Sequence, residues 1–184
     1  MRVITGTARG RRLTTLEGED VRPTTDRVKE ALFSMIQFQV EGRRVLDLFA
    51  GSGQLGIEAL SRGALGCTFV DSGARAIEVV KKNLQETGLI KQARVAHMDA
   101  QSFLSGCRER FDIVLLDPPY GGGLLQSVLP LLPEKMNPGG AIICESAAGE
   151  KLPEEAGVFL PEKNRRYGKI QLTIYSHRDV IAGE

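Results

Sequence analysis

The sequence predicts an α/β protein built around one mostly parallel sheet, with helices on both faces. Two patterns support this prediction. From residue 43 onward, short apolar runs alternate with segments of helical periodicity. Near the end of the chain, residues 169–176 alternate apolar and polar side chains, as expected of an antiparallel or edge strand. The length of 184 residues suits a single domain with its own core, which we expect to span residues 1–184.

The first forty residues precede this alternation. A basic N-terminal hairpin extension is predicted over residues 1–22, because two strand-like runs flank a glycine-containing tip. Residues 24–38 predict a helix, since their apolar side chains fall on one face. Thr24, Thr25 or Asp26 can cap its start.

The alternating elements follow in chain order. Strands are predicted at 45–49, 68–71, 94–98, 111–116, 141–145 and 169–176. Helices are predicted at 54–62, 74–87, 100–107 and 124–135. In the second of these helices Ile77, Val80 and Leu84 point inward, and Gly88 provides the stop.

The composition is that of an ordinary soluble globular protein, with 42% hydrophobic and 26% charged residues. No apolar run approaches the roughly 20 residues that span a bilayer, and the N-terminus lacks the apolar core of a signal peptide. We therefore expect a cytoplasmic protein without a membrane partner. The three cysteines are far apart and lack a Cys-x-x-Cys spacing, and there are only two histidines. We expect neither a disulfide nor a metal site.

The net charge is only +1, but arginines gather in two segments of the chain. The first sixteen residues contain four arginines and no acid, and a second basic cluster lies at 163–169. Patches of this kind can contact phosphates on a neutral protein, although solvated loops have the same composition. The candidate phosphate-binding residues are Arg2, Arg9, Arg11, Arg12, Arg165 and Arg166.

The most informative turn is Asp117-Pro118-Pro119-Tyr120, which directly follows the apolar run 111–116. Two consecutive prolines fix the backbone and remove two N–H donors, so the carbonyl oxygens there lack ladder partners. A carboxylate oxygen and a carbonyl oxygen can accept the two hydrogens of an NH2 group while the aromatic ring stacks on its plane. The turn therefore predicts a site for a planar group that bears an amine. A strand-ending turn with a buried tyrosine is the alternative.

Four predicted strands end in an acid, at Asp47, Asp71, Asp99 and Asp117. In open α/β sheets, ligands bind beyond the carboxyl ends of the strands, so we expect these acids at one ligand site. The turn at 47–56 contains Gly-x-Gly-x-x-Gly, which also matches the dinucleotide fingerprint. A carboxylate four residues before the first glycine would repel a pyrophosphate and attract a cofactor with ammonium and sulfonium groups. Asp71 can take two ribose hydroxyls under either interpretation.

The glycine turn and the strand-end acids suit S-adenosylmethionine. The order of these motifs along the chain resembles that of the class I methyltransferases that modify exocyclic amines. The order is Asp-x-Phe-x-Gly-x-Gly, Val-Asp, Asp-Ala and Asp-Pro-Pro-Tyr. More narrowly, segments 2–13, 22–33 and 166–169 resemble the bacterial enzymes that methylate N2 of a guanine in small-subunit (16S) ribosomal RNA. The resemblance implies a Rossmann-like class I methyltransferase fold. Its sheet would be mostly parallel and seven-stranded, with an antiparallel strand near the C-terminus and a small N-terminal β-hairpin.

The resemblance also implies a cofactor and a partner. The cofactor is S-adenosylmethionine, with residues 24–27 near its methionine end, and Asp99 with the Ala100 N–H can contact its adenine. The partner is 16S rRNA, within a small ribosomal subunit or an assembly intermediate, and the N-terminal hairpin would touch this RNA. Some relatives of this kind carry Asn in place of Asp117. The predicted cofactor-binding residues are Thr25, Asp47, Phe49, Gly51, Gly53, Asp71, Ser72, Asp99 and Ala100.

The predicted chemistry is direct methyl transfer to an exocyclic base nitrogen. Asp117 and the Pro118 carbonyl would accept the amine hydrogens, Pro119 would stiffen the turn and Tyr120 would stack on an unstacked base. Four alternatives stay open. Within the same class, the target is an N6-adenine of DNA or RNA, or a glutamine amide of a protein. In other classes, the chain is a nicotinamide-dependent oxidoreductase or a non-catalytic RNA-binding module.

Overall fold

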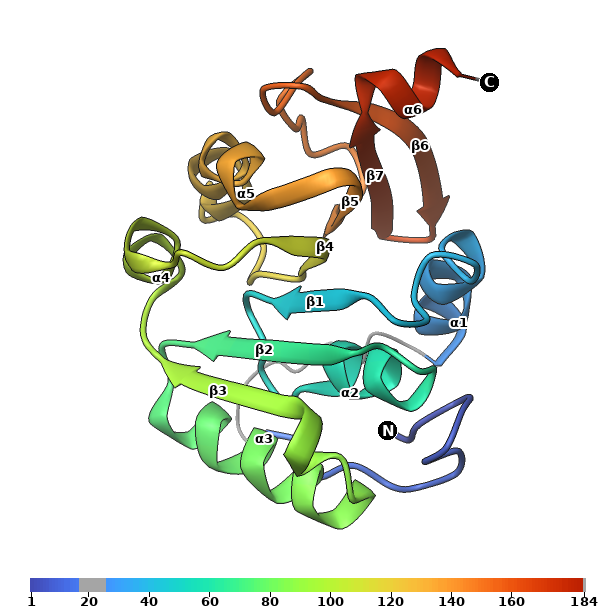
Figure 1. Ribbon diagram of the computed structural model, residues 1–184, viewed down its shortest axis with the longest axis vertical. Coiled ribbons are helices and arrows are strands. Elements are labelled where there is room, and N and C mark those ends of the chain that lie inside the picture. Colours follow the sequence, from blue (N-terminus) through green and yellow to red (C-terminus); the bar gives the residue numbers. More distant parts are fainter. Residues whose placement is uncertain (17–25, 184) are drawn as a thin grey trace.

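A computed structural model of the chain describes residues 1–16 and 26–183. Its centre is a seven-stranded sheet with the strand order β3-β2-β1-β4-β5-β7-β6 (Figure 1). Neighbouring strands from β3 to β5 are parallel, and β7 runs antiparallel to both β5 and β6, which confirms the predicted sheet. The strands are β1 (Arg44–Asp47), β2 (Gly66–Asp71), β3 (Ala93–His97), β4 (Phe111–Leu116), β5 (Met136–Ala147), β6 (Phe159–Tyr167) and β7 (Ile170–His177).

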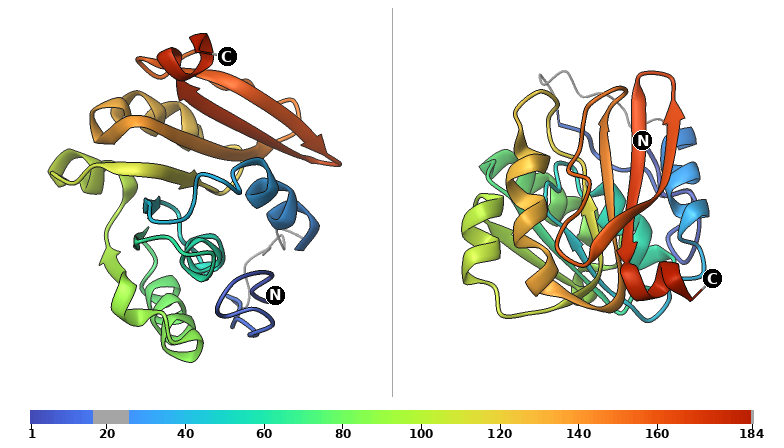
Figure 2. Two further views of the ribbon diagram at one scale, coloured as in Figure 1. Left: turned by 45° about the vertical axis from the view of Figure 1, so that its right-hand side comes forward. Right: turned by 90° about the horizontal axis from the view of Figure 1, so that it is seen from above.

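Helices cover both faces of the sheet, because successive strand side chains point into two different cores. One core joins Val45 and Ile113 to α1, α2 and α3, and the other joins Leu46 and Val114 to α4 and α5. Figure 2 shows α4 and α5 together on one side and α1 on the other. No helix in the described part of the chain has the length and apolar character needed to cross a bilayer. The helices are α1 (Asp26–Met35), α2 (Gln54–Ser61), α3 (Ala74–Thr87), α4 (Ala100–Gly106), α5 (Leu124–Val128) and α6 (Arg178–Ala182).

Most predicted elements begin and end within two residues of their expected bounds. The strand predicted at 111–116 and the helix predicted at 74–87 match at both ends. Gly88 follows that helix with φ 75°, a left-handed conformation that favours glycine and ends the helix as expected. Where a glycine or an acidic residue marks the end of a helix or strand, the local sequence pattern was sufficient to predict that end.

In the second half of the chain, one helix is shorter than predicted, the strand predicted at 141–145 is the longer β5, and one strand was not predicted. The helix predicted at 124–135 is α5 followed by two 3₁₀ turns, η2 (Leu129–Leu131) and η3 (Pro133–Lys135). Pro130 and Pro133 cannot donate the hydrogen bonds that would continue an α-helix. β6 was not predicted as a strand, because Pro161 and several charged residues obscure its alternation; as an edge strand it tolerates both.

The N-terminal arm, defined here as residues 1–16, folds back on itself as a hairpin with only one β-bridge, between Arg2 and Arg12. Two short strand-like runs were expected here, but the backbone hydrogen bonds between them are few, such as the one from the Val3 N–H to the Arg11 carbonyl at 2.9 Å. The helix predicted at 24–38 is α1, and the proposed caps Thr24 and Thr25 lie outside the described residues.

The arm is fixed to the sheet through a buried carboxylate on α2. Glu58 is fully buried and accepts hydrogen bonds from the Ile4 N–H at 2.8 Å and the Thr5 N–H at 3.0 Å. Lys29 of α1, also fully buried, lies 3.7 Å from Glu58 and donates to the Arg2 carbonyl at 2.6 Å. Burial lowers the pKa of Lys29, and the nearby Glu58 opposes that change. Breaking a buried pair of this kind costs about 3–5 kcal/mol, so the arm is a fixed part of the fold.

Candidate active site

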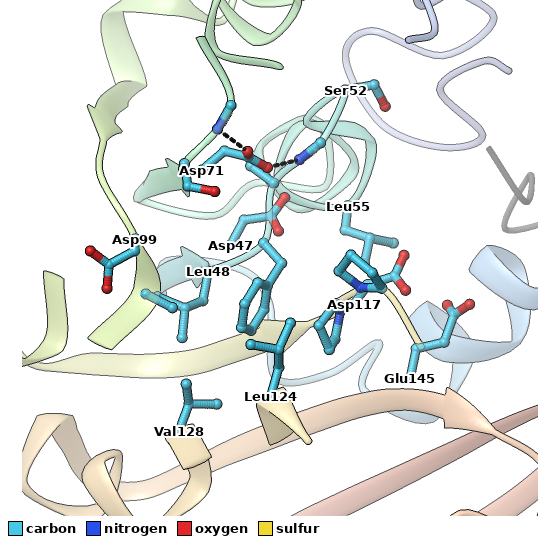
Figure 3. Close-up of a pocket in the computed structure, with 18 of the residues that line it drawn as sticks. Asp47, Leu48, Ser52, Leu55, Asp71, Asp99, Asp117, Leu124, Val128 and Glu145 are labelled. Atoms are coloured by element: carbon cyan, nitrogen blue, oxygen red, sulfur yellow. Dashed lines mark hydrogen bonds between the residues drawn. The ribbon is translucent and has the colours of Figure 1, made fainter. Parts of the chain in front are cut away.

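A pocket of about 1160 Å³ opens at the carboxyl ends of the parallel strands, where the sequence predicts a ligand site (Figure 3). The parallel topology places the ends of β1, β2, β4 and β5 side by side, so residues distant in sequence meet there. Most of the predicted site residues line this pocket: Asp47, Phe49, Gly51, Asp71, Ser72, Asp99, Ala100, Asp117, Pro118, Pro119 and Tyr120.

The glycine turn between β1 and α2 forms the floor of the pocket. Gly51 has φ 55°, and a Cβ atom there would meet nothing within 4 Å, so its backbone faces open space. Gly53 is buried at the start of α2 and does not line the pocket; a Cβ there would lie 3.2 Å from Val80. Gly56 allows α2 to approach β2, because a Cβ would lie 2.3 Å from the Phe69 ring. The turn thus exposes Gly51 to a ligand and uses the other two glycines for packing.

Asp47 ends β1 beneath this turn. Its side chain is buried, and its Oδ2 accepts a hydrogen bond from the Gly56 N–H at 2.9 Å. The pKa of Asp47 is raised to about 7, mainly by burial; the Gly56 hydrogen bond opposes this rise and the nearby Asp71 adds to it. The pocket therefore holds a carboxyl group that a bound cation would ionise.

Asp71 and Asp99 lie toward one side of the pocket in Figure 3. The two oxygens of Asp71 accept hydrogen bonds from the Gly51 and Gly73 N–H groups, each at 2.8 Å. Asp99 caps α4 by accepting from the Ser102 N–H at 2.9 Å, and these hydrogen bonds lower the pKa of Asp99. The backbone thus fixes both carboxylates while their outer faces line the pocket.

The 117–120 turn lies on the other side. Asp117 is half-buried, Pro118 is buried, and Pro119 is exposed. Tyr120 is half-buried, and its hydroxyl donates to Oε1 of Glu145 at 3.2 Å. Figure 3 shows Asp117 and Glu145 together at this side of the pocket, so a flat group held there would face the ligand space near Asp47.

Glu145 and Gln54 are among the pocket residues that the sequence reasoning missed. Glu145 ends the apolar run Ala-Ile-Ile-Cys, which is the same signal that identified the other strand-end acids. Gln54 is 8% exposed, and its Oε1 has no hydrogen-bond partner among the described residues. No local sequence signal marks Gln54, because its position at the pocket depends on how α2 packs on the sheet.

The candidate RNA-binding arginines fall into two groups. The Thr7 N–H donates to the Ser61 carbonyl at the end of α2, which places the arm tip and its Arg9 and Arg11 away from the pocket. Arg2 and Arg12 pair at the bridge, at the end of the hairpin opposite its tip, and Arg2 also contacts Asp26. The second group, Arg165 and Arg166, is exposed beside the β6–β7 turn. This turn lies at the pocket edge of the sheet, because the start of β7 pairs with the carboxyl end of β5.

The predictions for Thr25, the cysteines and a metal site can also be compared with the structure. Thr25 lies outside the described residues. The three cysteines are free, and Cys67 and Cys144 are buried in strands. Residues 1–16 and 26–183 contain no cluster of three or more His, Cys, Asp or Glu side chains positioned to hold a metal ion.

Comparison with known proteins decides the family. The profile of the family described as conserved hypothetical protein 95 matches residues 1–176. The chain belongs to this family, the family of ribosomal RNA small subunit methyltransferase D. Members of the conserved hypothetical protein 95 family align over most of their length. YlbH of Bacillus subtilis (strain 168) is 43% identical over 183 residues, which cover 97% of this chain and all of that protein.

A second family member, ribosomal RNA small subunit methyltransferase D of Escherichia coli (strain K12), is 35% identical over 177 residues. The match covers 95% of this chain and 89% of that protein. The solved structure of yhhF from Escherichia coli has a TM-score of 0.86 at 35% identity, over 96% of this chain and 97% of that one. The family resemblance and the class I methyltransferase fold predicted from sequence are therefore confirmed.

Proposed function

We propose that this chain is an S-adenosylmethionine-dependent methyltransferase that acts on the exocyclic N2 amine of a guanine in small-subunit ribosomal RNA. One observation carries the proposal: the 117–120 turn and the strand-end acids Asp47, Asp71 and Asp99 line the same pocket. A site for a planar amine therefore faces a site suited to a cofactor rich in hydrogen-bond donors. The family members named above as ribosomal RNA methyltransferases support this assignment.

The pocket lining fits S-adenosylmethionine. The Asp71 carboxylate suits two ribose hydroxyls, and Asp99 with the Ala100 N–H suits an adenine edge. Asp47 and Gln54 Oε1, which has no partner within residues 1–16 and 26–183, suit an ammonium group and a positive sulfur, since both present acceptors in a buried environment. Phe49 and Ser72 complete the lining, and Thr25 stays a prediction. When bound, this cofactor supplies a methyl group that a weak nucleophile can attack.

The residues of the 117–120 turn supply the rest of the chemistry. A guanine amine is a poor nucleophile because its lone pair is delocalised into the ring. The Asp117 carboxylate and the Pro118 carbonyl accept its two hydrogens and orient the nitrogen, and the Tyr120 ring holds the base plane by stacking. The negative charge of Asp117 stabilises the positive character that the nitrogen gains. Asp117 or water then takes the proton, which is acidic only after the nitrogen has gained its new bond.

The kind of RNA substrate follows from which bases can reach the 117–120 turn. A base inside a duplex cannot reach a turn at the edge of a sheet, so the target guanine is an unpaired or extruded nucleotide. Arg165 and Arg166, beside the β6–β7 turn at the pocket edge of the sheet, contact phosphates near this nucleotide, and the arginines of the arm contact RNA farther from the pocket. The partner is 16S rRNA within a small subunit or an assembly intermediate.

The decisive experiment identifies the methylated nucleoside. The purified protein is incubated with methyl-labelled S-adenosylmethionine and with either small-subunit RNA or small subunits from a strain that lacks the enzyme. Digestion to nucleosides and mass spectrometry are expected to show the label in N2-methylguanosine. Label in N6-methyladenosine, or label in protein rather than RNA, would contradict the proposal.

Arg166→Ala is expected to weaken RNA binding through the loss of one phosphate contact. The plot of log K against log salt concentration should become shallower by about 0.7, and kcat at saturating RNA should be unchanged. Lys91→Ala is a matched control, because it removes one exposed positive charge just before β3, at the edge opposite the pocket. Equal effects of the two substitutions would show that the β6–β7 turn makes no specific contact.

A further inference from the structure

The N-terminal arm contributes two side chains to the pocket, although the mechanism above uses the arm only for RNA. Met1 and Leu16 are half-buried and line the pocket together with Ser52 of the glycine turn. The Ser52 hydroxyl donates to the Met1 sulfur at 3.4 Å, so arm and turn are in contact there. Figure 3 shows Ser52 on the side of the turn away from Asp99. The arm therefore borders a different part of the ligand space from that acid.

Asn83 of α3 joins the arm to the glycine turn. Its side chain is 0% exposed. Its Nδ2 donates to the Ser52 carbonyl at 2.9 Å and to the Thr14 carbonyl at 3.0 Å, and its Oδ1 accepts from the Thr14 N–H at 2.8 Å. An amide group has two N–H hydrogens and one carbonyl oxygen, so all of its polar groups are engaged here. One buried side chain thus fixes the backbones of both segments.

These hydrogen bonds set the shape of the pocket on this side. The turn is held from its other side by Asp71, whose Oδ2 accepts from the Gly51 N–H at 2.8 Å. Thr14 lies two residues before Leu16, so the bonds to Asn83 also fix where the Leu16 side chain meets a ligand. A buried backbone group that loses its only partner is costly, so removal of the amide would displace the arm, the turn or both.

We propose that Asn83 is a positioning residue for the cofactor: it holds the arm against the glycine turn, and Leu16 of the arm forms an apolar wall of the S-adenosylmethionine site. The inference rests on the proposed function and deepens it, because the arm then contacts the cofactor as well as RNA. Leu16 lies away from the adenine side, so its wall suits the methylene groups of the methionine part. Asn83 does not line the pocket and acts through the arm and the turn.

The main test is Asn83→Ala, which leaves three backbone groups without their partner. The Kd for S-adenosylmethionine, measured by calorimetry, is expected to rise by about tenfold. The KM for the cofactor should rise with it. At saturating cofactor and RNA, kcat should change less than about twofold, because the 117–120 turn is not altered.

Ser61→Ala is the matched control, because Ser61 fixes the arm at its tip. This buried side chain on α2 accepts from the Ala8 N–H at 2.9 Å and donates to the Thr5 carbonyl at 2.6 Å, and it does not line the pocket. Its loss should lower the thermal melting temperature about as much as Asn83→Ala does, but change the cofactor Kd less than about twofold. Anchors with a purely structural role would give the two variants the same cofactor affinity.

A second pair of variants keeps the test decisive if Asn83→Ala does not fold. Leu16→Ala shortens the apolar wall and leaves the Asn83 hydrogen bonds in place, since these involve the backbone of Thr14. It should weaken cofactor binding by about fivefold. Leu65→Ala makes the same change at a side chain that is 61% exposed, just before β2 and outside the pocket, and should leave the Kd unchanged.

Two kinds of result would overturn the inference, and they differ. If Asn83→Ala and Ser61→Ala have the same cofactor Kd, or Leu16→Ala binds the cofactor like the unaltered protein, the arm is not part of the cofactor site. Only this inference is then lost, because the unaltered protein still methylates guanine. If the unaltered protein does not bind S-adenosylmethionine, the proposed function fails, and the inference fails with it.

Discussion

Asp117→Ala is expected to lower kcat by about 10²–10³-fold or more while the Kd for S-adenosylmethionine changes less than about twofold. The reason is the position of Asp117 at the end of β4, on the side of the pocket away from Asp71 and Asp99, where the proposed function places the target base. Loss of its carboxylate removes a hydrogen-bond acceptor and a negative charge that act on the reacting nitrogen. Single-turnover kinetics with saturating RNA, together with calorimetry of cofactor binding, measure the two quantities separately.

Asp117→Asn is the matched control. Asparagine keeps the shape and one acceptor oxygen but loses the charge, so kcat should lie between those of the alanine variant and the unaltered protein. This order separates positioning of the amine from stabilisation of its positive charge. If cofactor affinity falls together with kcat in both variants, Asp117 belongs to the cofactor side of the pocket and the assigned role is wrong.

Asp47→Asn is expected to stabilise the protein and weaken cofactor binding at the same time. The pKa of Asp47 is raised from 3.8 to about 7 by burial, so its stabilising contribution is fully present below pH 3.8 and is lost as the pH rises to about 7. That rise corresponds to about 4 kcal/mol of lost stability above pH 7. Asparagine avoids this loss while it can still accept from the Gly56 N–H, so the gain should appear at pH 8 and vanish near pH 4.

Chemical denaturation at several pH values checks this expectation, and calorimetry at pH 8 should show at least about a tenfold weaker affinity for the cationic cofactor. In the unaltered protein, cofactor affinity should rise with pH through about 7, because ionised Asp47 attracts the positive charge. Asp99→Asn is the opposite control. Hydrogen bonds with Ser102 lower the pKa of Asp99, so loss of this carboxylate should slightly destabilise the protein above the ordinary pKa of an aspartate, and the effect should disappear as the pH falls through the lowered pKa. A gain in stability for both variants would argue against burial as the cause.

Much of the fold was predictable because local patterns and topology agree. Apolar runs that end in an acid identified β1, β2 and β4, and a parallel sheet brings such ends together without further information. β6 was hidden because an edge strand needs no continuous apolar face, and Pro161 and its charged neighbours resemble a loop. The α-helix α5 ends early because of Pro130 and Pro133. The prediction of one continuous helix gave more weight to the helical spacing of apolar residues than to these two prolines.

The acidic residues of the candidate site could be predicted from the sequence, but the contacts between its side chains could not. The strand-end carboxylates follow from sequence, but the contact between Tyr120 and Glu145 depends on the register of β4 and β5. The course of the N-terminal arm depends on Glu58, a residue more than fifty positions away that a sequence pattern treats as an ordinary helix surface residue. Register and long-range burial are properties of the packed molecule.

The strand order has a consequence for synthesis of the chain. β7, formed by residues 170–177, lies between β5 and β6, so β5 has an unpaired edge until residues 170–177 have emerged from the ribosome. A bare edge of an apolar strand can recruit another chain, and nascent or truncated copies that end before β7 would expose it. Pairing of β7 with β5 closes this edge and, in the same event, places Leu172 beside Glu145.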